Sequence, residues 1–211
     1  MKIETYVFGP AMTNCFLVYD EGSKRGWVVD PGMNPSQLLS RMQELEIKLE
    51  AILLTHAHFD HIGGVEAVRE LSGAPVYVHR AEADWLTDPA KNGSTFFPGF
   101  PLVTCQPAEQ LLAGGESLEL VGEELKVLHT PGHSPGSVTY VWRDVIFSGD
   151  VLFQQSIGRT DLPGGDYETL MRSIHELLME LPEGTRVLCG HGPATTIGRE
   201  QQSNPYVTGG L

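Results

Sequence analysis

The feature that most constrains this chain is a dense group of metal-binding residue types directly after an apolar run of strand length. Residues 51–54 are all apolar, as in a strand that is buried on both faces. The segment 55–63 then reads THAHFDHIG, which places three histidines and one aspartate within six positions. Because imidazole and carboxylate groups are common metal ligands, this density predicts a metal site.

The expected local structure divides these side chains into two pairs. Helices are expected near residues 80–86, over residues 167–181 with Leu177 in an apolar stripe, and over residues 61–72, where apolar residues as far as Leu71 recur at helical spacing. His56 and His58 then lie on the turn that leaves the preceding strand, while Asp60 and His61 lie where the helix over 61–72 begins. One short turn can thereby offer one pair of ligands to each of two metal ions.

Three later segments supply further candidate ligands, each directly after or beside a glycine at the end of an apolar segment. They are His133 in TPGHS, Asp150 in FSGD and His191 in CGHG. Together with the earlier four they make seven candidates, and two divalent ions can share such a set. The other histidines, which we interpret as packing, supporting or surface residues, are His79, His129 and His175.

Length and composition favour one globular domain. The chain has 211 residues, so we expect residues 1–211 to fold as a single domain. Its apolar content is 41%, but no apolar stretch reaches membrane-spanning length, so neither a membrane span nor a membrane partner is predicted. Cys15, Cys105 and Cys189 are odd in number and widely spaced, which favours a reducing cytoplasm over a disulfide framework.

With these residues the chain resembles the metallo-β-lactamase superfamily, whose members are mostly hydrolases. The resemblance rests on the HAHFDH motif and on the later His, Asp and His in that order. Two segments, SIGRTDLPGGD at 156–166 and HGPATTIGRE at 191–200, resemble the short glyoxalase II-like proteins, which hydrolyse acyl thioesters such as hydroxyacylglutathione. The resemblance implies an α/β fold, a four-layered αββα sandwich, with the ligands on loops at one edge.

The resemblance also implies a role for each candidate ligand. The implied ligands of the first ion are His56, His58 and His133, those of the second are Asp60, His61 and His191, and the bridging ligand is Asp150. Zinc is the expected metal, with iron and manganese as alternatives, because these ligands suit all three. Asp30, in VVDPG, matches a supporting aspartate that orients imidazoles, although DPG is also a good turn by itself.

Together with this ligand set, the resemblance implies hydrolysis of a small thioester. Water held between two divalent ions loses a proton near neutral pH, and the resulting hydroxide attacks the thioester carbonyl. One ion stabilises the developing oxyanion, and Asp60 and Asp150 are the catalytic carboxylates of this centre. S-Lactoylglutathione or a related thiol ester is the expected substrate.

The charge balance agrees with a small anionic substrate. The chain carries 14 basic and 27 acidic residues, a formal net charge of −13. Such a surface repels a polyanion, so no nucleic acid partner is expected. Two divalent ions add four positive charges, and Asp60, Asp150 and a bridging hydroxide remove three. The site is then a positive centre in an acidic body, which attracts a small acyl-thiol anion by local focusing of the field.

Two segments are candidates for substrate binding. Residues 88–107 form a long connection rich in proline, glycine and phenylalanine, so Phe97 is expected on an apolar lip over the metals, unless the loop packs on itself. Arg159 is expected to pair with a substrate carboxylate through its planar fork. The alternative for Arg159 is a structural ion pair with Asp161 or Asp166.

Other functions share parts of this pattern. A persulfide dioxygenase of the same superfamily would hold a single iron with His56, His133 and Asp150, and it shares the GRTD segment at 158–161. A lactonase would use the same metal pair, whereas a non-catalytic protein would bind metal without turnover. Asp150 argues against the β-lactamases that have a cysteine ligand at this position. The oligomeric state is left open.

Overall fold

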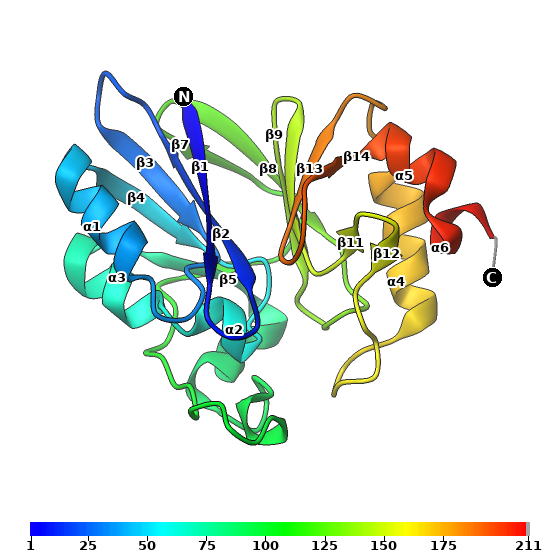
Figure 1. The fold of residues 1–211 in the computed structure, drawn as a ribbon, viewed down its shortest axis with the longest axis horizontal. Helices are drawn as coiled ribbons and strands as arrows, with labels where there is room; N and C mark the ends of the chain where they lie inside the picture. The colour runs from blue at the N-terminus through cyan, green and yellow to red at the C-terminus, as the bar shows by residue number, and fades with distance from the viewer. Residues whose placement is uncertain (210–211) are drawn as a thin grey trace.

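In the computed structural model, which describes residues 1–209, six strands from the first part of the chain form one mixed sheet (Figure 1). In spatial order they are β1 (Lys2–Phe8), β2 (Thr13–Tyr19), β3 (Arg25–Val29), β4 (Lys48–Leu53), β5 (Val76–His79) and β6 (Gln110–Leu112). The first three strands are antiparallel neighbours, and the pairs from β3 to β6 are parallel. Because parallel neighbours need crossover connections, α1 (Ser36–Leu45) and α3 (Val65–Ser72) follow β3 and β4 and cover the outer face.

A second six-stranded sheet is formed by the later part of the chain. In spatial order it contains β14 (Thr195–Thr196), β13 (Arg186–Cys189), β10 (Val145–Gly149), β9 (Val138–Trp142), β8 (Glu123–His129) and β7 (Ser117–Leu120). Its neighbours are antiparallel except for β10 and β13. Three helices lie outside it, namely α4 (Tyr167–Ser173) with its π-helical continuation η3 (Ile174–Leu178), α5 (Ile197–Ser203) and α6 (Pro205–Thr208).

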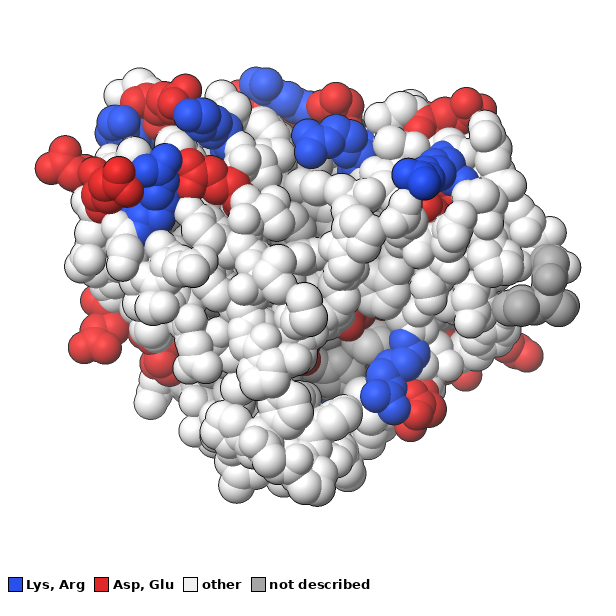
Figure 2. All heavy atoms as spheres, viewed as in Figure 1, with Lys and Arg blue, Asp and Glu red and all other residues white. Residues whose placement is uncertain are grey.

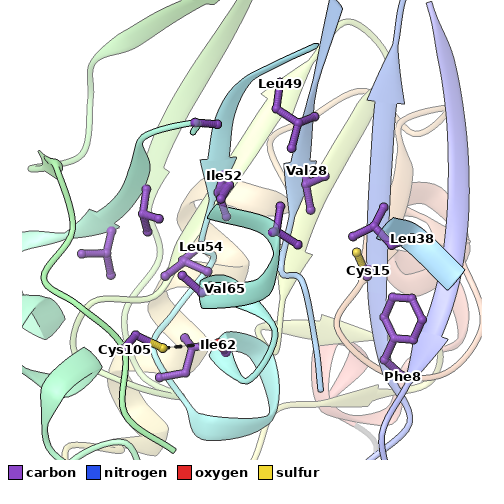
Figure 3. Close-up of a cluster of buried hydrophobic side chains, with 14 of the residues drawn as sticks. Phe8, Cys15, Val28, Leu38, Leu49, Ile52, Leu54, Ile62, Val65 and Cys105 are labelled. Atoms are coloured by element: carbon purple, nitrogen blue, oxygen red, sulfur yellow. Dashed lines mark hydrogen bonds between the residues drawn. The ribbon is translucent and has the colours of Figure 1, made fainter. Parts of the chain in front are cut away.

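The two sheets and their outer helices make the expected four-layered αββα sandwich, which is therefore confirmed. Three buried apolar clusters lie between the layers. Strand β2 contributes to two of these clusters, because successive side chains of a strand point to opposite faces of the sheet. Cys15 and Leu17 face the helices of the first sheet, while Phe16 and Val18 face the second sheet. Figure 3 shows Leu38 of α1 and Val65 of α3 in the helix-side cluster. In residues 1–209, no helix has the length and hydropathy to span a membrane.

The predicted continuous helix over residues 61–72 is wrong. The structure has two helices, α2 (Phe59–Ile62) and α3, separated by Gly63 and Gly64. A Cβ atom at Gly63 would lie 2.6 Å from Met33 Cγ, and one at Gly64 would lie 2.6 Å from the Gly32 carbonyl oxygen. The two glycines therefore let the chain pack against the loop after β3, and this tertiary contact interrupts the helical run.

The helix predicted over residues 167–181 is also shorter than expected. It ends as η3 at Leu178, and its apolar stripe includes Leu177, which is 36% exposed. Leu71, in the stripe predicted for the earlier helix, is 39% exposed. The segment predicted as a helix near 80–86 is a 3₁₀ helix, η1 (Arg80–Thr87). The remaining short elements are η2 (Ser94–Phe96), β11 (Leu152–Phe153) and β12 (Ser156–Ile157).

Candidate metal centre

The structure brings all seven candidate ligands together at one end of the sandwich. They lie on the loop after β4, on α2, on the β8–β9 loop and directly after β10 and β13. Their donor atoms form three overlapping groups, and within each group all donors lie within 4.8 Å of one another. The groups are His56 with His58 and His133, His56 with His61 and Asp150, and Asp60 with His61 and His191.

The first group consists of three buried histidines. His133 Nε2 lies 2.9 Å from His58 Nδ1 and 3.2 Å from His56 Nε2. Burial lowers the pKa of each of the three, and it lowers the pKa of His58 to about 3. Neutral imidazoles therefore present their ring nitrogens to one common point, which is the arrangement that a divalent cation requires.

The other two groups share His61 and are together called the second group from here on; they combine imidazoles with the carboxylates of Asp60 and Asp150. His191 Nε2 lies 3.2 Å from Asp60 Oδ2 and 3.4 Å from Asp150 Oδ2. Burial opposes protonation of His191, but its hydrogen bonds to Asp150 and Asp60 raise its pKa to about 10. Burial likewise opposes protonation of His61, while the charges of Asp60, Asp150 and Asp30 raise its pKa well above the ordinary range. The carboxylates thus make this group strongly attractive to positive charge.

Two unpartnered atoms test whether this centre fits a metal. His61 Nε2 and Asp150 Oδ1 are buried, and among residues 1–209 neither has a hydrogen-bond partner. They lie 3.4 Å apart. A buried polar atom without a partner is unfavourable by about 1–3 kcal/mol. A cation between the two groups would satisfy both atoms, so the residues fit the divalent metal that this type of donor set implies.

Asp30 lies behind the second group. Its backbone is left-handed, with φ of 48°, and its carboxylate accepts hydrogen bonds from the Thr55 backbone N–H at 2.8 Å and the Thr55 hydroxyl at 2.6 Å. Its Oδ2 lies 3.0 Å from His61 Nδ1. An N–H at Nδ1 leaves Nε2 free toward the centre, so Asp30 is placed to orient this imidazole. Its side chain is therefore engaged at the metal centre.

Three other groups that contact the candidate ligands or their loops were not predicted from the sequence. The Thr13 hydroxyl donates to Asp60 Oδ2 at 2.7 Å, across 47 positions of sequence. The Arg159 carbonyl lies 2.8 Å from His133 Nδ1. The buried Glu82 accepts hydrogen bonds from the loops on both sides of the first group. All three contacts join segments that are distant in sequence, and no local pattern in the chain signals them.

A pocket of about 290 Å³ opens onto the metal centre. Donors of both groups form its floor, and apolar side chains form much of its wall; those of the wall include Phe59, Phe97, Phe100 and Leu162. Phe97 and Phe100 each lie 5.2 Å from the ring of Phe59, so this part of segment 88–107 does form an apolar lip. Phe96 is 50% exposed and does not line the pocket. In Figure 2 the end of the molecule that holds α2 carries few charged side chains.

The structure shows the ion-pair alternative for Arg159, while its pairing with a substrate carboxylate stays a prediction. Arg159 lines the pocket, with its guanidinium 5.9 Å from the Phe97 ring centroid. It also makes a two-point ion pair with Asp161, with both N–O distances at 2.7 Å. Asp166 instead accepts the Thr169 backbone N–H at the start of α4.

The three other histidines lie outside the donor groups of residues 1–209. The rings of His79 and His129 stack at 4.1 Å, and their Nε2 atoms lie near backbone carbonyl oxygens. His175 is exposed on the outer helical layer. Each position is compatible with the packing, supporting or surface role expected for it.

Comparison with known proteins identifies related sequences of the same length. The sequence profile of the metallo-β-lactamase superfamily matches residues 8–191. The probable metallo-hydrolase YqgX of Bacillus subtilis is 47% identical, and the match covers 99% of each chain. The hydroxyacylglutathione hydrolase GloC of Haemophilus influenzae is 37% identical, and the match covers 98% of each chain.

Solved structures with the same fold cover nearly the whole of this chain. The BLEG-1 B3 metallo-β-lactamase is 49% identical, with a TM-score of 0.94 over 98% of this chain and 100% of that one. TTHA1623 in a di-iron-bound form is 38% identical, with a TM-score of 0.82, and the match covers 96% of this chain and 99% of that one. ETHE1 from Myxococcus xanthus is 28% identical, with a TM-score of 0.80, and the match covers 99% of this chain and 85% of that one. The chain therefore belongs to the metallo-β-lactamase superfamily.

Proposed function

We propose that this protein is a binuclear metal-dependent hydrolase of small acyl thioesters. The observation that carries the proposal is the complete double donor set, five members of which line a pocket with an apolar wall and one arginine. The similarity to a hydroxyacylglutathione hydrolase over nearly the whole of both chains supports the thioester class. S-Lactoylglutathione or a related small anionic thiol ester is the proposed substrate.

The proposed ligand assignment follows the donor groups. The first ion is assigned to His56, His58 and His133, the second to Asp60, His61 and His191, and Asp150 lies between them. Two divalent ions, when bound, supply an activated water and an electrophile for the substrate carbonyl. Zinc is the metal that we propose; imidazole and carboxylate ligands also suit iron and manganese, and the di-iron-bound form of TTHA1623 makes iron the first alternative.

The residues of the chain perform the remaining tasks. Asp60 and Asp150 would supply the negative charge that offsets the repulsion between two bound ions, and the Thr13 hydroxyl fixes the orientation of Asp60. The apolar lip excludes water from the side of the acyl group, which strengthens electrostatic interactions within the pocket. Hydrolysis breaks the C–S bond, and because a thiolate is a good leaving group, no dedicated general acid is required.

A second candidate is hydrolysis of a β-lactam amide by the same site. It is favoured by the 49% identity to the BLEG-1 B3 metallo-β-lactamase, whose fold superposes with a TM-score of 0.94. The chemistry is related, since hydroxide attacks a carbonyl in both cases. An amide nitrogen is a poorer leaving group than a thiolate and needs a proton donor. We therefore place thioester hydrolysis first.

The deciding experiment measures metal content and turnover on one sample purified without added metal. We expect about two metal ions per chain and hydrolysis of S-lactoylglutathione, lost on chelation and restored by metal. A chromogenic β-lactam and a glutathione persulfide are assayed in parallel. One iron per chain, with oxygen uptake on the persulfide and no thioester turnover, would establish the dioxygenase instead. Higher kcat/KM for the β-lactam would establish the second candidate.

Arg159 provides a test of substrate anchoring. Replacing Arg159 with alanine is expected to raise KM for S-lactoylglutathione roughly tenfold with little change in kcat, because it removes a charge-assisted contact made equally in substrate and transition state. The matched variant is Asp161→Asn, which releases the guanidinium from its ion pair. If Arg159 has only a structural role, both variants will shift KM alike.

A further inference from the structure

Glu82 is a fully buried carboxylate that lies between two ligand-bearing loops. It belongs to η1, and its side chain has no exposed surface. Its Oε2 accepts a hydrogen bond from the Ala57 backbone N–H at 2.6 Å, and its Oε1 accepts one from the Gly136 backbone N–H at 2.6 Å. A single side chain therefore joins the loop after β4 to the loop between β8 and β9.

The β8–β9 loop is shaped to admit this carboxylate. A Cβ atom at Gly136 would lie 2.8 Å from Glu82 Cγ, 2.9 Å from Cδ and 3.0 Å from Oε1. These distances are shorter than side chains tolerate, so glycine at this position permits the contact. Burial raises the pKa of Glu82, while hydrogen bonds from Ser134, Ala57 and Gly136 lower it. A buried carboxylate is unfavourable unless hydrogen bonds satisfy it, and here both oxygens are satisfied.

Both loops carry ligands assigned to the same ion. Ala57 lies between His56 and His58, and Gly136 lies three residues after His133. We propose that Glu82 is a positioning residue that fixes the spacing of the three histidines of the first ion. The inference rests on the ligand assignment of the proposed function. The hydrogen bond from each loop ends on a different oxygen, so the rigid carboxyl group sets the distance between the loops.

The second ion has its own support. Asp30 orients His61, and Thr13 holds Asp60, whereas Glu82 hydrogen-bonds to neither of these ligands. Asp30 also accepts the Thr55 hydroxyl, whose Oγ1 lies 3.1 Å from His56 Nδ1, so this carboxylate reaches one ligand of the first ion as well. A variant at Glu82 should weaken the first ion selectively, whereas a variant at Asp30 should weaken the second ion most.

The test is metal titration of the full chain after chelation, with Co²⁺ followed by its absorption spectrum and Zn²⁺ by competition with a chromogenic chelator. In Glu82→Gln the side chain keeps its shape, but an amide NH₂ group faces one of the two backbone N–H donors. We expect affinity for the first ion to fall about 10–100-fold, the usual effect of removing an outer-shell partner, with the second ion unchanged. Asp30→Asn is expected to lower affinity for the second ion directly and affinity for the first ion to a smaller extent, through Thr55 and His56.

Glu200 is the matched control. It too is a fully buried carboxylate, and it accepts hydrogen bonds from the Gln155 backbone N–H and the Asn204 amide, away from the donor groups. Glu200→Gln is expected to lower thermal stability without a selective change in either metal affinity. If Glu82→Gln does not fold, Gly136→Ala serves as the second variant. Its added methyl group displaces the Glu82 carboxylate from the side of the β8–β9 loop.

The possible outcomes separate the inference from the proposed function. If the unaltered protein binds two ions but Glu82→Gln binds both as before, or loses affinity for both equally, the positioning role is wrong. If the unaltered protein itself fails to bind two ions, the proposed function is wrong. Selective loss of the first ion, with its cobalt spectrum altered, supports the inference.

Discussion

Replacing Asp150 with alanine is expected to prevent pairing of the two metals and to lower kcat/KM for the thioester at least about a thousandfold, since a metal clamp supplies several kcal/mol. Asp150 Oδ2 lies 3.4 Å from His191 Nε2 and 3.7 Å from His133 Nε2, so this carboxylate reaches both donor groups. Burial raises its pKa, but the charge of His61 and the contact with His191 hold it well below the ordinary range. The side chain is therefore an anion at neutral pH.

The measurement is metal content per chain together with kcat/KM for S-lactoylglutathione. Asp144→Ala is the control, because this aspartate is exposed in the turn between β9 and β10. It should keep two metals and full turnover. An Asp150→Ala protein with two metals and unchanged turnover would show that the bridging assignment is wrong.

Replacing Gly190 with alanine is expected to disable the centre without removing any ligand. A Cβ atom at this position would lie 2.1 Å from Asp150 Oδ1 and 2.7 Å from His61 Cε1. The added methyl group must therefore displace the bridging carboxylate or the imidazole beside it. We expect metal content to fall below two per chain and kcat/KM to fall about a hundredfold, the usual effect of misplacing a catalytic group by about 1 Å.

Gly184 offers a close comparison in the turn before β13. A Cβ atom there has no neighbour within 4 Å, so Gly184→Ala should change neither metal content nor turnover. Metal analysis, kcat/KM and thermal unfolding of both variants separate a local effect from general destabilisation. Two tightly bound metals and normal turnover in Gly190→Ala would contradict the close packing of Asp150 against this glycine.

The sequence predicts the double donor set because each candidate combines a ligand residue type with the end of an apolar strand. The structure brings His133, Asp150 and His191 to the HAHFDH motif even though they lie far along the chain. The contacts that orient these ligands could not be predicted in the same way. Thr13 and Glu82 meet partners between 25 and 54 positions away, and no local spacing encodes such contacts.

Errors in the predicted secondary structure have the same origin. The longer strands show alternation or continuous apolar runs and were predictable, whereas β11, β12 and β14 have only two residues each. The predicted helix over 61–72 fails because contacts with Met33 and the Gly32 carbonyl interrupt it at the glycine pair. Apolar periodicity predicts which face of a helix or strand is buried, but it does not predict which distant backbone segment packs against that face.

Each group of assigned ligands draws on both sheets of the sandwich. His56 and His133, for example, stand 77 positions apart in sequence, yet their ring nitrogens lie 3.2 Å apart. Bound metal would therefore act as a reversible cross-link that closes long loops, as a disulfide does in secreted proteins. Resistance to unfolding would then rise with the free metal concentration, because only the docked sheets present a complete set of ligands. The same ions that perform the chemistry would also fasten the two sheets of the molecule to each other.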